Sequence, residues 1–186
     1  WDLLGVFKRL KRVPFDDRRF NRRWKVRSDD VEMTDLLLRS GAHVNTANDY
    51  GVTPLSLACV NRNVTIVERL LAAGADPNAV TSMGETALMT CTRTGSVDAV
   101  TALLDQGASN INATEMSRGQ TALMWAAAEG HASVAHALLE IGAALDVRLK
   151  SGFTPLFFAV REGHIDVVHT LLEAGANLEE VLQRVK

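Results

Sequence analysis

The chain has 186 residues, of which 47% are hydrophobic and 23% charged, a composition typical of a soluble globular protein. No apolar run approaches the roughly 20 residues of a membrane-spanning helix. No signal-peptide pattern is visible, because Lys8, Arg9, Lys11 and Arg12 interrupt the first apolar residues. We therefore expect a cytoplasmic location, with export left open because the chain begins with Trp1.

The net charge of −2 hides a division along the chain. Residues 1–27 carry ten Lys and Arg against three Asp, whereas the remaining residues are acidic overall. Two interpretations of this basic segment stay open. It is a terminal cover of the fold, or it is an arm that binds an acidic partner, a nucleic acid or an anionic membrane.

Glycine–alanine pairs recur along most of the chain and define a period. They begin at residues 41, 74, 107, 142 and 175, so that the steps are 33, 33, 35 and 33 residues. Such a constant step over residues 28–177 predicts an array of similar units that stack on one another.

Each complete unit contains signals for two short helices. A threonine precedes the apolar pattern of the first helix, where its hydroxyl can cap the helix N-terminus. Apolar residues then recur at i, i+3 and i+4, and a glycine ends the second helix. Helices of about 8–10 residues are too short to persist alone in water, so burial must come from neighbouring units. The capping threonines are Thr53, Thr86, Thr121 and Thr154, and Pro54 and Pro155 follow two of them at the first helical position.

These residues resemble the ankyrin repeat, in particular repeat arrays of the bacterial type, through the Thr-Pro-Leu openings at Thr53 and Thr154 and the Gly-His pairs at Gly130 and Gly163. The resemblance implies an all-α ankyrin-repeat solenoid of about five stacked helix-turn-helix units with projecting turns or hairpins. It also implies that His131 and His164 form hydrogen bonds that tie one loop to the next. The units expected are 28–47 (partial), 48–80, 81–115, 116–148 and 149–177.

The two ends depart from this pattern. Counting back by the repeat places Trp24 at the position of Trp125, but Arg22 and Lys25 then stand where later repeats have Leu and Ala. Residues 1–27 are therefore predicted to be a degenerate repeat or a cap. At the other end, residues 178–186 have apolar spacing typical of a short C-terminal capping helix.

The two cysteines, Cys59 and Cys91, fall on the buried side of first helices in successive repeats, one position out of register. Packed helices lie about 8–10 Å apart, whereas a disulfide needs Cα atoms within about 7 Å. We therefore expect two buried free thiols.

No pattern of catalytic or metal-binding residues rises above background, so we predict a non-enzymatic protein without cofactor or metal. The glycines are solitary and periodic, and no Ser or Cys stands in a recognisable nucleophile motif. Four of the five histidines form two repeat-related pairs, His131 with His164 and His136 with His169, and no Cys or third His joins them.

Since no chemistry is indicated, we predict a protein-binding scaffold that contacts its partner through the turn tips and the first helices. We expect a monomer, with neither a small-molecule substrate nor a nucleic-acid or membrane partner. The alternative is that the basic N-terminal arm binds nucleic acid or an anionic membrane and the repeats only carry it. For Trp125 and Phe158, packing between repeats competes with binding. The expected contact residues, taken from the variable positions that the resemblance implies, are Asp49, Tyr50, Val52, Met83, Glu85, Arg93, Arg118, Gln120, Trp125, Glu129, Lys150, Phe153, Phe158, Arg161 and Glu162.

The step of 35 residues places two extra residues between Gly107 and Thr121. This segment corresponds to the turn between repeats, so we expect the third projecting turn to be longer than its neighbours. Insertions in solenoids often lie on the functional face, although a surface loop also tolerates them without function.

Overall fold

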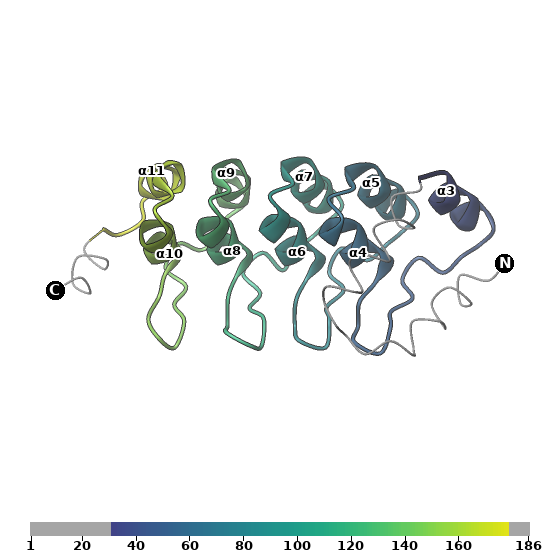
Figure 1. The fold of residues 1–186 in the computed structure, drawn as a ribbon, viewed down its shortest axis with the longest axis horizontal. Helices are drawn as coiled ribbons and strands as arrows, with labels where there is room; N and C mark the ends of the chain where they lie inside the picture. Colours follow the sequence, from purple (N-terminus) through teal and green to yellow (C-terminus); the bar gives the residue numbers. More distant parts are fainter. Residues whose placement is uncertain (1–30, 179–186) are drawn as a thin grey trace.

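The computed structural model describes residues 31–178, and the predictions made for residues 1–27 and for the C-terminal capping helix fall outside this range. The helices form two rows, and the turns between repeats project from one side (Figure 1). One row, nearer the projecting turns, holds the first helices α4 (Pro54–Val60), α6 (Ala87–Thr94), α8 (Ala122–Glu129) and α10 (Pro155–Glu162). The other row holds the second helices α3 (Val31–Arg39), α5 (Val64–Ala72), α7 (Val97–Asp105), α9 (Ala132–Glu140) and α11 (Ile165–Glu173). We number the repeats from α3, so that α4–α5 is the second repeat and α10–α11 the fifth.

The first helices begin where the sequence predicts. The hydroxyl oxygen of Thr53 accepts a hydrogen bond from the backbone N–H of Ser56, and the other three capping threonines make the same bond. Each bond satisfies one of the backbone donors that a helix leaves free at its start. Pro54 and Pro155 stand at the first helical position, as expected.

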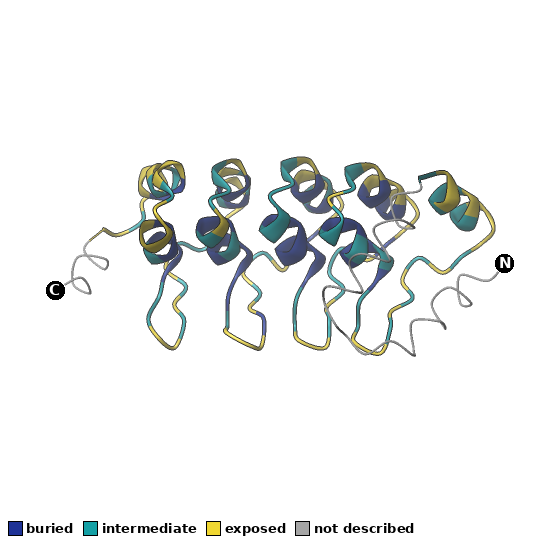
Figure 2. Ribbon diagram, viewed as in Figure 1, coloured by how far each residue is buried: buried dark blue, intermediate teal, exposed yellow. Residues whose placement is uncertain are grey.

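The core runs along the array between the two rows of helices (Figure 2). Leu55, Leu88, Leu123 and Leu156 occupy the same place in successive repeats, and each is at most 2% exposed. Their burial depends on stacking, because no single pair of short helices encloses a volume of its own. The predicted all-α solenoid is thereby confirmed.

Asparagine side chains link the turns that follow the second helices. Asn78 donates from Nδ2 to the carbonyl oxygen of Gly107 at 2.9 Å, and its Oδ1 accepts from the N–H of Ser109 at 2.9 Å. Asn45 makes the equivalent pair of bonds one repeat earlier, and Asn112 does so one repeat later. These links, which were not predicted from the sequence, satisfy backbone groups left over at each helix end.

Histidines tie the loops between first and second helices. Nε2 of His131 donates to the carbonyl oxygen of Arg93 at 3.2 Å, and Nε2 of His164 donates to that of Ala128 at 3.0 Å. Each ring lies against the helix-ending glycine of the preceding repeat. The hydrogen-bonding role expected for these two residues is confirmed.

The expectation of free thiols is wrong, because Cys59 and Cys91 form a disulfide between α4 and α6. Their Cα atoms are 4.6 Å apart. The error lay in comparing a distance between helix axes with a distance between Cα atoms. Each Cα atom lies about 2.3 Å from its own axis, so residues that face each other across axes 8–10 Å apart come within roughly 3.4–5.4 Å.

Candidate partner-binding face

The face formed by the projecting turns and the first helices carries the residues expected to bind a partner. The ends of the turns are exposed, whereas their bases merge into the buried core (Figure 2). Eight of the fifteen expected residues are exposed, namely Asp49, Tyr50, Met83, Arg118, Glu129, Lys150, Arg161 and Glu162. Five are partly buried, namely Val52, Glu85, Arg93, Trp125 and Phe153.

Gln120 and Phe158 are buried, with 2% and 5% of their surface exposed. Neither side chain therefore offers much surface to a partner in the free protein. For Phe158, packing between repeats was the alternative to binding. Its burial supports packing. Trp125 stays half-buried and contributes to the surface as well as to the packing.

Backbone hydrogen bonds hold the first three turn tips in register. The N–H of Ser82 donates to the carbonyl oxygen of Tyr50 at 2.8 Å, and the N–H of Met116 donates to that of Met83 at 2.8 Å. Tyr50, Met83 and Met116 are 50%, 51% and 75% exposed. The three tips therefore present a row of large apolar side chains.

Met116 was missed as a candidate, although it lies 33 residues after Met83, one repeat length further on. The insertion obscured this spacing, because alignment on the tip glycines places Arg118 opposite Met83. The backbone bond between Met83 and Met116 shows which residues stand side by side.

The third projecting turn is longer than its neighbours, as predicted. In the second repeat, the N–H of Asn48 donates to the carbonyl oxygen of Val52, and the same four-residue closure recurs at Thr81 and Leu149. In the inserted turn the corresponding bond runs from Glu115 to Gln120. The tip therefore contains one additional residue.

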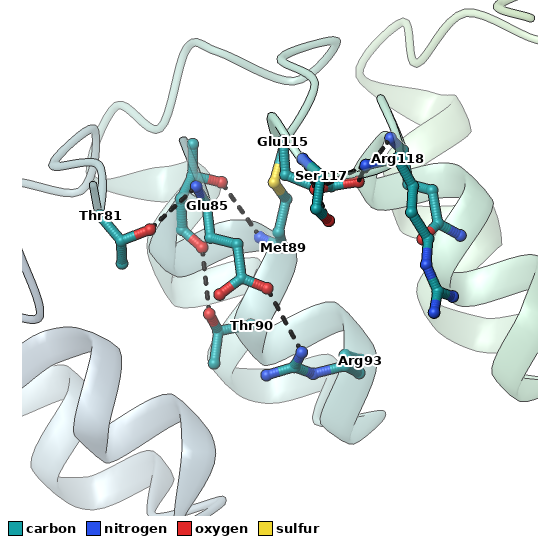
Figure 3. A network of polar contacts seen from close by, with 10 residues as sticks. Thr81, Glu85, Met89, Thr90, Arg93, Glu115, Ser117 and Arg118 are labelled. Carbon is teal, nitrogen blue, oxygen red and sulfur yellow. Dashed lines mark hydrogen bonds and ion pairs between the residues drawn. The ribbon is translucent and has the colours of Figure 1, made fainter. Parts of the chain in front are cut away.

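A buried carboxylate organises this longer tip. Glu115 is 3% exposed, and its side-chain oxygens accept from the hydroxyl of Ser117 and from the backbone N–H groups of Ser117, Arg118 and Gln120 (Figure 3). Burial by itself would raise the pKa of Glu115, whereas these hydrogen bonds favour the ionised form and lower the pKa. The hydrogen bonds outweigh burial, so the pKa is below its usual value. The carboxylate is thus a structural anion that holds the backbone of Arg118.

Two arginines of the first helices lie over aromatic rings. Nη1 of Arg93 lies 3.3 Å from Oε1 of Glu85 (Figure 3), and its guanidinium carbon is 5.4 Å from the centre of the Trp125 ring in the next repeat. The guanidinium of Arg161 similarly lies 5.6 Å from the Phe153 ring and 5.0 Å from the Phe158 ring. These contacts already restrict the rotamers of the two arginines, so less side-chain entropy remains to be lost in any further contact.

Within residues 31–178, no group of three or more His, Cys, Asp or Glu side chains is arranged to hold a metal ion. In the same part of the chain, no helix has both the length and the apolar character needed to cross a membrane.

Stacked pairs of antiparallel helices joined by protruding turns define a helical repeat solenoid. A family model described as ankyrin repeats (3 copies) matches residues 24–115 and 109–181, and the chain belongs to this family. A comparison with curated proteins returned no match. Ankyrin repeats are generally protein–protein interaction modules, and the family is typically non-catalytic.

Proposed function

We propose that this protein binds a protein partner on the face formed by the turn tips and the first helices. The observation that carries the proposal is a row of three exposed apolar side chains, Tyr50, Met83 and Met116, on neighbouring tips that backbone bonds join. Exposed aromatic residues and methionine are enriched at protein interfaces. Because backbone bonds already hold these tips, association costs little backbone conformational entropy there.

The first helices extend this face beyond the tips. Trp125 is half-buried under Arg93, and Arg161 covers Phe153. Tryptophan and arginine are the residues most often found at the energetic centres of interfaces. We therefore place the centre of the contact between the tip row and the Arg93–Trp125 pair.

Charge does not select the partner. Asp49, Glu85, Glu129 and Glu162 offset the four basic residues Arg93, Arg118, Lys150 and Arg161 on this face. We therefore expect an interaction dominated by apolar and aromatic contacts, with an affinity that changes little with salt concentration.

The test compares a binding-face variant with a matched variant on the other side of the solenoid. Tyr50→Ala, Met116→Ala and Phe153→Ala remove side chains from the binding face. Leu36→Ala and Ile165→Ala remove exposed apolar side chains, 58% and 68% exposed, from the second helices, which form the row farther from the tips (Figure 1).

Proteins captured by the wild type are purified, and their dissociation constants are measured against both variants. We expect the binding-face variant to bind at least tenfold more weakly and the second-helix variant to bind within twofold of the wild type. The proposed face is wrong if the two variants bind equally well, or if the second-helix variant alone loses affinity.

A further inference from the structure

We propose that the Cys59–Cys91 disulfide takes the place of a missing histidine tie, and that the cohesion of the second and third repeats therefore depends on redox state. The two junctions closer to the C-terminus are each held by a histidine ring. At these junctions His131 contacts the carbonyl oxygen of Arg93, and His164 contacts that of Ala128.

The histidine tie requires a glycine in the preceding repeat. A Cβ atom at Gly95 would lie 2.6 Å from Cε1 of His131, and one at Gly130 would lie 2.7 Å from Nδ1 of His164. Such distances are too short for non-bonded atoms, so the ring occupies its place only because the glycine has no side chain.

The junction between the second and third repeats lacks both the glycine and the histidine of this tie. Its counterpart of Gly95 is Arg62, which has a φ of 58°, and its counterpart of His131 is Ser96. The backbone conformation of Arg62 is unfavourable for a residue that has a Cβ atom. Its side chain also stands at the place that a histidine ring would need.

At this junction the disulfide joins α4 to α6 directly. Both cysteines are fully buried, and the bond closes a covalent loop over one repeat length, with a sequence separation of 32. The hydroxyl of Thr94 donates to the carbonyl oxygens of both Cys59 and Cys91, at 3.3 and 2.9 Å. Within the described repeats, this is the junction whose linkage a reductant can break.

Reduction by a dithiol breaks the Sγ–Sγ bond with transfer of two electrons and two protons. The products are two thiols and the oxidised, disulfide form of the reductant. The reverse step needs a disulfide of a small thiol or an oxidoreductase as electron acceptor. Because both sulfur atoms are buried, attack by a thiolate requires the helices to separate first. We therefore expect slow reduction in the folded protein.

The experiment measures amide hydrogen exchange of the full chain with and without dithiothreitol, after complete reduction has been verified by thiol titration. Reduction is expected to accelerate exchange at least tenfold in α4, α5 and α6, with less than a twofold change in α10 and α11. Loop-closure entropy for this spacing corresponds to a fall in melting temperature of roughly 7–15 °C on reduction. No partner is present, so the outcome is independent of the proposed binding face.

A Cys59→Ala/Cys91→Ala variant should reproduce the reduced state under all conditions. Adding Arg62→Gly and Ser96→His to it installs the histidine tie of the other junctions. Protection of α4 to α6 should then return and be insensitive to dithiothreitol.

Several outcomes would overturn the proposal. These are two free thiols in the protein before reduction, unchanged exchange after reduction, or equal loosening of every repeat. Failure of the added histidine tie to restore protection would overturn the claim that the disulfide stands in for it.

Discussion

The imidazole ring of His131 lies directly against Gly95 of the preceding repeat. A Cβ atom at position 95 would lie only 2.6 Å from Cε1 of the ring. Gly95 has a φ of 74° and ends α6 in the left-handed conformation. It thus serves two purposes, because it stops a helix and leaves room for the ring that joins two repeats. The two contributions can be separated by experiment.

Gly95→Ala is expected to lower the free energy of unfolding by about 1–2 kcal/mol for the left-handed backbone and by a further ~0.5–1.5 kcal/mol for the displaced hydrogen bond of His131. The control is Gly163→Ala, because Gly163 has a φ of 77° and no described atom within 4 Å of an added Cβ. Chemical denaturation measures both variants. An equal loss for both would show that the contact with His131 contributes nothing.

The carboxylate of Glu115 makes the longer tip sensitive to pH. Its pKa is lowered in the folded protein, so it contributes stability above the unfolded value of about 4.3, and this stability is lost as the pH falls through the folded pKa. We expect Glu115→Gln to lower stability at pH 7 by about 1–3 kcal/mol, because a buried network loses its charged acceptor. Thermal melts at pH 7 and pH 3 should therefore differ less for the variant than for the wild type.

Glu85→Gln is the matched control for this prediction, because Glu85 stands before the first helix of the neighbouring repeat but is only partly buried. Its ion pair with Arg93 is partly exposed to solvent, so the loss should stay within about 1 kcal/mol. A loss at Glu85 equal to that at Glu115 would show that burial of Glu115 is not the cause.

The asparagine links predict a graded response. Asn78→Ala removes both the bond to the Gly107 carbonyl and the bond from the Ser109 N–H, and should cost about 1–3 kcal/mol. Asn78→Asp keeps an acceptor for Ser109 and loses only the donor, so we expect a smaller loss. Denaturant melts measure the loss of stability in each variant. A larger loss for Asn78→Asp than for Asn78→Ala would contradict the assignment of the two bonds.

Leu123→Ala tests the dependence of each repeat on its neighbours. Leu123 is 1% exposed in the middle of the array, so truncation should cost about 2–5 kcal/mol. Met116→Ala, at a 75% exposed position, should change stability by less than about 0.5 kcal/mol. Circular dichroism melts give both values, and similar losses at the two positions would contradict the stacked core.

Local signals predict the helices of this protein well, because each depends on residues a few positions apart. Thr53 and Thr121 cap their helices through groups three residues away, and the leucines of the core repeat with the period of the units. The roles of His131 and His164 followed from the resemblance to ankyrin repeats. The lengthened third turn also followed from the spacing of the glycines alone.

The candidate site is less predictable because it depends on contacts between repeats. The exposed tips Tyr50 and Met83 follow from their places in the turns, but Met116 was concealed by the insertion. Gln120 has the same place before a capping threonine as Glu85, yet Gln120 is buried and Glu85 is not.

Periodicity and helix capping are properties of the chain within one repeat, so they were enough to predict short capped helices that must stack. Which side chains meet across a junction became clear only from the folded array. The bond between Cys59 and Cys91, the asparagine links and the ring of His131 against Gly95 all depend on how closely neighbouring helices and turns approach. That distance is set by the packing of side chains from two repeats at once, and no pattern within one repeat contains it.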